Sequence, residues 1–370
     1  MSTIRQGDPG RVEVLDEEGA PRDGAVLPDL DDGDLVAMYR DMYFLRRFDR
    51  RMVGLSRQGR IGSLPPLRGH EAVQAATVHA LDDGDWIVPS YREHGAMTVH
   101  GLDPARVLWY FMGREDGNAV PSDVNALPIN GSVGSQVPHA TGAAWAARMK
   151  GDDRAFACYF GDGATSEGDF HEGMNFAGVF DAPVVFVCSN NQWAISVPRE
   201  RQTAAATLAQ KARAYGFEGL QVDGTDPLAL YRVTRDAVRK AKDPDEDEAR
   251  PTMVEAVLYR LGAHSTADDP DVYRDGVPEE WERKDPVPRF ESFLLETGRL
   301  DGEDRDALQD EVEGRIDDAV DRAEAAAAGD PDEIFEHTYA DLPPRLREQR
   351  DYLDDLRERR GDDALLNDDH

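Results

Sequence analysis

Residues 154–191 read RAFACYFGDGATSEGDFHEGMNFAGVFDAPVVFVCSNN, and this stretch decides the fold. It contains two short apolar runs, Arg154–Phe160 and Val184–Ser189. Between them, Ser166–Phe180 carries apolar residues at roughly the spacing of a helix. Short apolar runs that are separated by a single helix predict a βαβ unit with two parallel, buried strands.

The polar residues that follow the two predicted strands indicate a ligand site. Asp162 lies in a Gly-Asp-Gly turn after the first strand, and Asn191 ends the second. Parallel units of this kind bind ligands at the carboxyl ends of their strands, so the two side chains can converge. A carboxylate and an amide oxygen suit Mg²⁺ shared with phosphates, and a glycine turn before a helix suits a phosphate. The alternative is an ordinary Asp-Gly turn followed by an unrelated pair of asparagines.

The Gly-Asp-Gly turn, followed at this distance by Asn-Asn, resembles the thiamine-diphosphate motif of the 2-oxo acid dehydrogenase, transketolase and pyruvate decarboxylase group. The segments GDGATSEGDFHEGMNFAG and NNQWAIS are similar to one branch in particular. That branch is the alpha subunit of the heterotetrameric, decarboxylating first component of 2-oxo acid dehydrogenase complexes. The resemblance extends from about Leu35 to Arg350. It implies an α/β thiamine-diphosphate-binding fold with a mostly parallel central sheet, helices on both faces and a helical C-terminal extension.

A second segment of the resemblance concerns the diphosphate of the cofactor. Trp86–Ser90 reads as a short strand, and Tyr91-Arg92-Glu93-His94-Gly95 follows it. An arginine at the carboxyl end of a strand can bind phosphate oxygens in a bidentate manner, although most arginines in such positions are ordinary surface residues. The segment resembles the Tyr-Arg-x-His-Gly motif of the family, whose Tyr and Arg hold the diphosphate. We therefore expect this role for Tyr91 and Arg92.

The resemblance also assigns main-chain contacts and the metal ligands. Gly131–Pro138 (GSVGSQVP) resembles the segment that meets the aminopyrimidine ring of thiamine. By this resemblance Gly131 supplies a carbonyl oxygen and Val133 an apolar contact. The remaining expected residues follow the family motif: Gly163 and Ala164 contact the cofactor, and the Mg²⁺ ligands are Asp162, Asn191 and the main-chain oxygen of Trp193.

The expected catalytic residue is His264. A lone histidine in a loop is usually an ordinary surface residue, but this one follows the carboxyl end of the predicted strand Thr252–Tyr259. It also matches the Arg-x-Gly-x-His-Ser sequence of the family, in which the histidine faces the thiazolium and takes part in acid–base steps or in receiving the lipoyl group. The next loop, Ser265–Arg274, resembles one that some relatives phosphorylate. We interpret it as an ordered, cofactor-gating loop.

Composition restricts the class of protein and indicates its surroundings. The 370 residues include 74 acidic and 42 basic side chains, which gives a formal net charge of −32 and argues against nucleic-acid binding. The acidic residues occur throughout the chain, whereas lysine occurs only at Lys150, Lys211, Lys240, Lys242 and Lys284. Such an acidic, lysine-poor surface is typical of proteins in the cytoplasm of a halophile, where molar salt screens the repulsion between carboxylates. The two cysteines, Cys158 and Cys188, lie in predicted buried strands and read as core residues.

The chain shows neither a signal peptide nor an apolar run long enough to span a membrane, so we expect a cytoplasmic protein. Three regions are expected from composition and periodicity. Residues 1–34 read as a flexible acidic N-terminal arm, and residues 35–300 as the thiamine-diphosphate-binding α/β domain. Residues 301–370 read as a helical C-terminal region that contacts a partner subunit, with its last ten residues frayed.

The resemblance implies oxidative decarboxylation of a 2-oxo acid, with thiamine diphosphate and Mg²⁺ as cofactors and transfer of the acyl group to the lipoyl arm of an acyltransferase component. Pyruvate is the first choice of substrate because of Gly131–Pro138, while Ala263–Thr266 looks more like branched-chain enzymes that use 3-methyl-2-oxobutanoate. In this branch the glutamate that activates the cofactor belongs to the beta subunit, and no segment here matches it. We therefore expect an α₂β₂ heterotetramer.

Three alternatives stay open beside the branched-chain enzyme. An acetoin dehydrogenase uses nearly the same alpha subunit. A transketolase amino-terminal half is disfavoured by the His264 motif and by Leu342–Gln349 (LPPRLREQ), which resembles the family. A non-catalytic scaffold subunit is disfavoured because Arg92, Asp162, Asn191 and His264 are all present.

Overall fold

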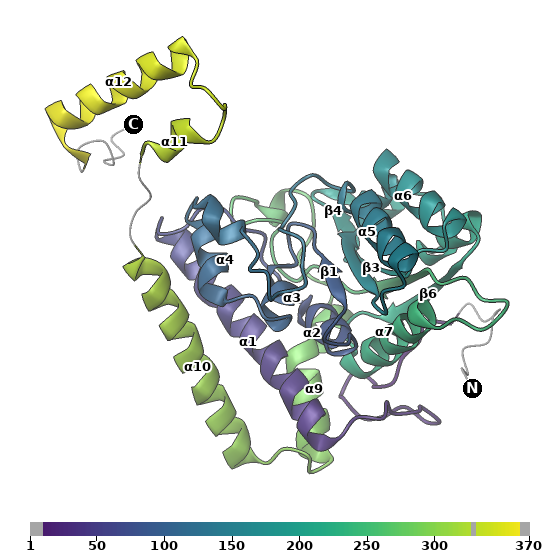
Figure 1. The fold of residues 1–370 in the computed structure, drawn as a ribbon. Coiled ribbons are helices and arrows are strands. Elements are labelled where there is room, and N and C mark those ends of the chain that lie inside the picture. Colours follow the sequence, from purple (N-terminus) through teal and green to yellow (C-terminus); the bar gives the residue numbers. More distant parts are fainter. Residues whose placement is uncertain (1–9, 327–330, 363–370) are drawn as a thin grey trace. The chain divides into compact units, whose positions relative to one another are not determined.

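The computed structural model describes residues 10–326 and 331–362, which belong to two compact units, Met1–Ala323 and Glu324–His370 (Figure 1). The first unit holds the predicted α/β domain. The sequence predicts that a separate helical region begins at residue 301, whereas the structure keeps most of helix α10 (Gly302–Ala325) in the first unit. The reason is an apolar stripe on α10, which includes Val312 and Ile316 and is buried.

The centre of the first unit is a parallel sheet, as predicted. Its five strands lie in the order β1-β2-β3-β7-β6, and every neighbouring pair is parallel. Strand β2, helix α6 (Gly168–Val179) and strand β3 form the predicted βαβ unit, which is thereby confirmed. The strands are β1 (Trp86–Val88), β2 (Phe156–Gly161), β3 (Val184–Asn190), β6 (Glu218–Asp223) and β7 (Thr252–Val257).

Alternate residues of each strand face two different helical layers, because successive side chains of a strand point to opposite faces. Along β2, Ala157 and Tyr159 join the larger core, whereas Phe156, Cys158 and Phe160 join the smaller one. The larger core lies under α1 (Asp32–Arg57), α2 (Glu71–His79) and α7 (Pro227–Lys242), and the smaller under α5 (Gln136–Lys150) and α6. Cys158 and Cys188 are both free and buried, which confirms that they pack in the core.

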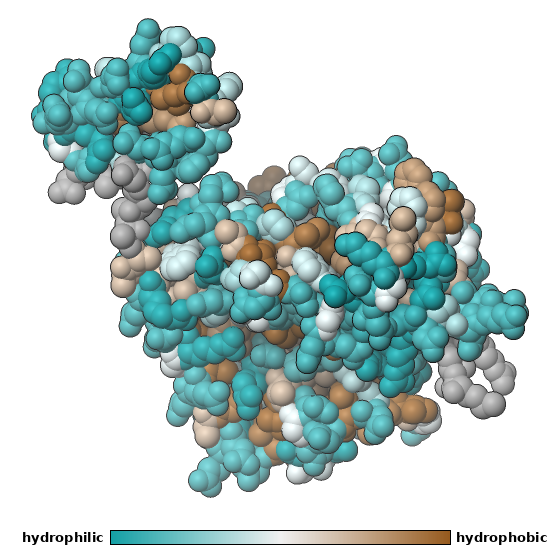
Figure 2. Space-filling model, in the orientation of Figure 1, coloured by the Kyte–Doolittle hydropathy of each residue, from teal (hydrophilic) through white to brown (hydrophobic). Residues whose placement is uncertain are grey.

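The outer surface is mainly hydrophilic on the face shown in Figure 2. Helices α5 and α6 carry an apolar region on this otherwise hydrophilic surface, where aromatic rings stack against one another and are exposed to solvent. The rings of Trp145 and Phe180 lie 3.9 Å apart between centroids, and those of Phe176 and Phe180 lie 5.7 Å apart. Met149 and Val179 nearby are also exposed, so the two helices present an apolar face to solvent.

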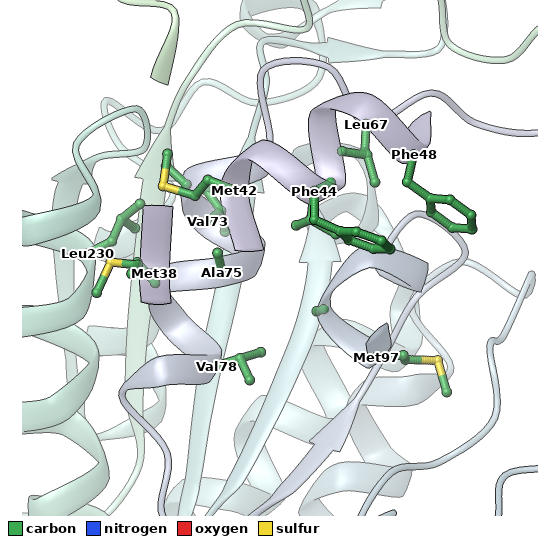
Figure 3. Packing of buried hydrophobic residues seen from close by; sticks show 14 of the residues in the cluster. Met38, Met42, Phe44, Phe48, Leu67, Val73, Ala75, Val78, Met97 and Leu230 are labelled. Atoms are coloured by element: carbon green, nitrogen blue, oxygen red, sulfur yellow. The ribbon is translucent and has the colours of Figure 1, made fainter. Parts of the chain in front are cut away.

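The larger core stabilises the layer that carries α1 and α2 (Figure 3). Helix α1 begins at a capping box in which Asp31 and Asp34 bind each other's main chain, and its apolar positions then repeat at helical spacing. Figure 3 shows side chains from α1, from α2 and from Leu230 of α7 meeting over the sheet. The labelled residues of α1 and α2 are Met38, Met42, Phe44, Phe48, Val73, Ala75 and Val78.

The described part of the N-terminal arm is docked, which differs from the prediction of a flexible arm over residues 1–34. Val14 and Leu15 are fully buried. Their main-chain amides donate to the carboxylate of Asp226 at 2.6 and 2.7 Å, and Arg289 donates to the carbonyl oxygen of Leu15 at 2.7 Å. Two buried residues give no periodic signal, and their partners lie more than 200 positions away, so the sequence pattern missed the docking. Residues 1–9 lie outside the described part.

The other helices and strands of the first unit are short. A two-stranded antiparallel hairpin follows β3, and α3 follows β1. Their bounds are α3 (His94–Val99), α4 (Pro104–Phe111), α8 (Glu279–Arg283), α9 (Pro286–Glu296), β4 (Trp193–Ala194) and β5 (Val197–Pro198), with short 3₁₀ helices at Glu115–Asn118, Asp162–Ser166, Arg199–Arg201, Ala209–Tyr215 and Pro270–Val272.

The second unit is helical, as the sequence predicts. It contains α11 (Glu333–Glu336) and α12 (Pro344–Arg360), and none of the described residues of α12 is buried. The predicted fraying of the last ten residues falls mostly on residues 363–370, outside the described part. Within the described ranges, the structure contains no helix that is both long and apolar enough to span a bilayer.

Candidate active site

A cavity of about 410 Å³ lies at the carboxyl edge of the parallel sheet. Its volume is within the usual range for a small-molecule or cofactor site. Residues after β1, β2, β3 and β7 line it, together with the loop before α5. All ten residues that the sequence singled out lie on this one cavity: Tyr91, Arg92, Gly131, Val133, Asp162, Gly163, Ala164, Asn191, Trp193 and His264.

Asp162 begins the short 3₁₀ helix that follows β2, and its side chain is almost completely buried. Gln202 donates from Nε2 to Oδ2 of this carboxylate at 3.0 Å. Burial raises the pKa of Asp162 to about 6, although the hydrogen bond from Gln202 opposes the change. Among the described residues Asp162 has no ion-pair partner. A buried carboxylate of this kind gains most from a bound cation, because a cation offsets the cost of its lost hydration.

Asn191 directly follows β3. The main-chain N–H of Trp193 donates to Oδ1 of Asn191 at 3.2 Å, and Nδ2 of Asn191 lies 3.0 Å from Nε2 of His70. Gln192 and Ile195 have φ values of 72° and 54°, which is unusual for residues with a β-carbon and costly for a β-branched one. Trp193 and Ile195, beside this strained backbone, both line the cavity.

The donor set at this edge fits a hard divalent cation. It offers the Asp162 carboxylate, the Asn191 amide oxygen and the Trp193 carbonyl oxygen, which are the ligand types that Mg²⁺ takes. Three clustered His, Cys, Asp or Glu side chains, which would form an all-protein metal site, are not found within the described ranges. A divalent cation held by these oxygens would need further oxygen ligands from outside the protein.

Arg92 lies in the turn between β1 and α3 and is buried. Its guanidinium donates to the carbonyl oxygens of Pro66 and His264, the latter at 3.1 Å, and lies over the ring of Tyr91. The Tyr91 ring meets the His264 ring edge to face, with 5.8 Å between centroids. Tyr91, Arg92 and His264 thus form one packed group on the cavity wall.

His264 is held as a neutral imidazole. Nη2 of Arg92 and Nη1 of Arg260 lie 3.4 and 3.5 Å from its Nδ1, which are long contacts. Burial, followed by the charges of Arg92 and Arg260, lowers the pKa of His264 to about 4. Because both guanidinium groups are donors, Nδ1 is the acceptor and the ring proton resides on Nε2. His264 can therefore offer a proton to a group in the cavity.

The loop after His264 is tied down by polar contacts. The main-chain N–H of His264 donates to Oδ2 of Asp268 at 2.7 Å, and the Tyr273 hydroxyl donates to the same oxygen at 2.6 Å. Arg260 donates to the Tyr273 hydroxyl at 2.6 Å, and Arg274 donates to the carbonyl oxygens of Arg260 and Gly262. These contacts agree with the interpretation of residues 265–274 as an ordered loop beside the cavity.

Small residues keep the backbone close to the cavity. A β-carbon on Gly163 would lie 2.8 Å from the β-carbon of Ala194, a distance that real side chains do not adopt, so only glycine fits there. Val133 is 44% exposed at the cavity rim, and Gly131 is also exposed. The exposed side chain of Val133 can therefore pack against a ring of a ligand that enters the cavity.

Residues 39–332 match the protein family described as "Dehydrogenase E1 component". The chain belongs to this family. It is 39% identical to the pyruvate dehydrogenase E1 component subunit alpha of Bacillus subtilis, over 91% of this chain and 90% of the relative. It is also 39% identical to the subunits of the same name from Staphylococcus aureus and Bacillus cereus, over 91% of each chain. The predicted family is thereby confirmed.

The E1 component cavity also has polar lining residues that sequence reasoning missed. His70 and Glu93 are buried in its wall, and Gln202 reaches Asp162 from the segment after β5. Burial and the charges of Arg92 and Arg260 hold the pKa of His70 well below its usual value. Burial raises the pKa of Glu93 to about 7, against the effect of Arg92. Glu93 stands inside the quoted Tyr-Arg motif, whereas nothing in the sequence links His70 or Gln202 to the metal ligands.

Proposed function

We propose that this E1 component chain is the alpha subunit of a pyruvate dehydrogenase, which decarboxylates pyruvate oxidatively within a multienzyme complex. One observation carries the proposal: ten residues from distant segments of the chain, chosen from the sequence alone, line a single cavity. The names of its 39% identical relatives, whose chains it covers almost completely, support pyruvate as the substrate.

The cavity residues suggest how the chain would hold its cofactor, thiamine diphosphate with Mg²⁺. Asp162, Asn191 and the main-chain oxygen of Trp193 would bind the cation, and Arg92 with Tyr91 would bind the diphosphate. Gly131, Val133, Gly163 and Ala164 would contact the cofactor through the main chain or apolar atoms. When bound, thiamine diphosphate supplies the carbon nucleophile that takes up a 2-oxo acid and releases CO₂.

His264 would supply the main polar side chain that this subunit contributes to chemistry. The contacts of Arg92 and Arg260 with Nδ1 leave the proton of the neutral ring on Nε2. That proton can be offered to an oxygen or sulfur atom of a reactant, and the ring can take it back in a later step. Asp268 and Tyr273 fix the loop on which the histidine stands.

The proposal includes partners. A beta subunit would complete the site, with an α₂β₂ assembly as the expected stoichiometry, and a lipoyl-bearing acyltransferase component would receive the acyl group. The relatives are named as alpha subunits, which supports a partner chain. The chain would work in the cytoplasm of a halophile, a proposal that rests on the excess of 74 acidic over 42 basic residues.

Assays that follow the reduction of an artificial electron acceptor test the substrate, because this readout also detects acetoin, which carries no carboxylate and releases no CO₂. The chain is assembled with its beta subunit at high salt and supplied in turn with pyruvate, 3-methyl-2-oxobutanoate, 2-oxoglutarate and acetoin. We expect kcat/KM to be highest for pyruvate by at least about tenfold, which corresponds to about 1.4 kcal/mol of differential transition-state binding. A preference for 3-methyl-2-oxobutanoate or acetoin would assign the chain to one of the alternative enzymes. Activity with none of these four compounds would support the alternative of a non-catalytic scaffold subunit.

A further inference from the structure

The orientation of the Asn191 amide is fixed from both sides. A main-chain N–H can only donate, so the atom that faces the N–H of Trp193 at 3.2 Å must be the oxygen Oδ1. The amide nitrogen Nδ2 then faces Nε2 of His70 at 3.0 Å. Because Nδ2 is a donor, Nε2 of His70 must be the acceptor, and the histidine carries no proton on that nitrogen. His70 is completely buried, so no water competes for this contact.

The Asp162 carboxylate is held in a similar way. Gln202 donates from Nε2 to Oδ2 of Asp162 at 3.0 Å and also lies 3.4 Å from the carbonyl oxygen of Val197. Gln202 therefore engages Oδ2 of Asp162, and no other side chain among the described residues bonds to this carboxylate, although the main-chain N–H groups of Asp162 and Asn191 also approach it. A β-carbon on Gly163 would lie 3.7 Å from Oε1 of Gln202, so the two residues face each other across the strand end.

We propose that His70 and Gln202 are positioning residues for the divalent cation: His70 turns the amide oxygen of Asn191 toward it, and Gln202 leaves Oδ1 of Asp162 to bind it. The inference rests on the Mg²⁺ site of the proposed function. Oδ1 of Asn191 has two lone pairs, of which the N–H of Trp193 takes one. Without His70 the amide could flip and present its NH₂ group to the cation, which would be repelled. Partners of this kind orient ligands and strengthen metal sites in general.

The test measures the affinity for Mn²⁺, an analogue of Mg²⁺ that electron paramagnetic resonance detects. The full chain is assembled with its beta subunit and saturated with thiamine diphosphate, and free Mn²⁺ is titrated. His70→Leu and Gln202→Ala should each raise the Kd for Mn²⁺ by about 10–100-fold. His70→Gln keeps an acceptor oxygen in place of Nε2 and should stay within about threefold of the wild type.

A matched control comes from His79, which lies at the opposite end of α2 from His70 and whose ring bonds to the carboxylate of Asp41 at 2.8 Å. His79→Leu should leave the Kd for Mn²⁺ unchanged, since it makes the same substitution away from the metal ligands. Gln202 is partly exposed, so Gln202→Ala should fold and keep the melting temperature of the wild type even where His70→Leu does not fold.

Two results would overturn the inference. One is a Kd for Mn²⁺ within about threefold of the wild type in Gln202→Ala and in a folded His70→Leu. The other is an equal loss of affinity for Mn²⁺ in His70→Gln and His70→Leu. That result would show that the hydrogen-bond acceptor of His70 does not orient Asn191. A wild-type assembly that binds no Mn²⁺ with thiamine diphosphate would instead overturn the Mg²⁺ site of the proposed function itself.

Discussion

The guanidinium of Arg92 donates a hydrogen bond to the carbonyl oxygen of His264 at 3.1 Å, although 172 positions separate the two residues. The contact joins the turn between β1 and α3 to the loop after β7. It couples the residue that we expect to bind the diphosphate to the residue that we expect to act in catalysis. Loss of Arg92 should therefore affect both binding and, to a smaller degree, the rate.

Arg92→Ala should weaken the binding of thiamine diphosphate by about 2–5 kcal/mol, the usual cost of removing one partner of a buried charged hydrogen-bonded pair. Isothermal calorimetry of the chain assembled with its beta subunit at high salt measures the Kd. Excess cofactor should restore most of the rate but not all of it, since the loop at His264 loses a hydrogen bond. A Kd for thiamine diphosphate that stays at the wild-type value would show that Arg92 only holds the loop at His264 and does not bind the diphosphate.

His264→Ala should lower kcat by about 10²–10⁴, as the loss of a general acid–base group does, with little change in the Kd for thiamine diphosphate. Steady-state kinetics and calorimetry on one preparation separate the two quantities. His171→Ala, which alters an exposed histidine on α6 away from the cavity, is the control. If His264→Ala loses affinity and keeps its rate at saturating cofactor, His264 is a structural loop residue.

The pKa of His264 gives a pH prediction in the cofactor-free protein. Burial and two guanidinium groups lower the pKa to about 4. Between that value and about 6.5, the ordinary pKa of histidine, the unfolded chain binds a proton that the native site does not. The contribution of His264 to stability is therefore complete above about pH 6.5 and is lost as the pH falls toward 4. Nuclear magnetic resonance of ¹³C-labelled histidine, assigned with His264→Ala, should give a midpoint well below 6, and a midpoint near 6.5 would contradict the prediction.

Arg289 should be essential for docking the N-terminal segment. It forms a fully buried ion pair with Asp223 at 3.0 Å and donates to the carbonyl oxygens of Leu15 and Asp16. Arg289→Met removes the nearer of the two basic partners of Asp223 and leaves only Lys284, at 4.0 Å. It should lower the free energy of unfolding by about 3–5 kcal/mol in urea titrations at high salt. Limited proteolysis should then cut before residue 30 faster than in the wild type.

The control for this variant is Arg299→Met. Arg299 pairs with the exposed Asp32 at 3.2 Å, and an exposed pair of this kind contributes only about 0–1 kcal/mol. Equal destabilisation by the two variants would mean that the buried network around Arg289 has no special role.

Salt should stabilise the fold. The net charge of −32 leaves many carboxylates without a basic partner, so their mutual repulsion outweighs the ion pairs that salt also weakens. Between about 0.1 and 2 M KCl the screening length falls from about 10 Å to below 3 Å. The melting temperature, measured by circular dichroism, should rise steadily over this range. A constant melting temperature would contradict the proposal of a halophilic protein.

Local patterns in the sequence were sufficient for the core of the fold. The alternation of short apolar runs and helical periodicity between Arg154 and Asn191 predicted β2, α6 and β3 in the correct order and direction. These patterns are reliable because a buried parallel strand needs apolar residues on both faces and a helix needs them on one. The edge at which Asp162 and Asn191 meet followed from the direction of the strands.

Only the tertiary structure decided which polar partners meet at that edge and along the N-terminal segment. His70 contacts Asn191 across 121 positions, and Asp226 binds the amide of Val14 across 212. Hydrophobic periodicity states which face of an element is buried and does not state which polar group will lie opposite it. Hydrogen bonds depend on distances of about 3 Å and on the direction of each donor, and those are set only when the packed elements come together.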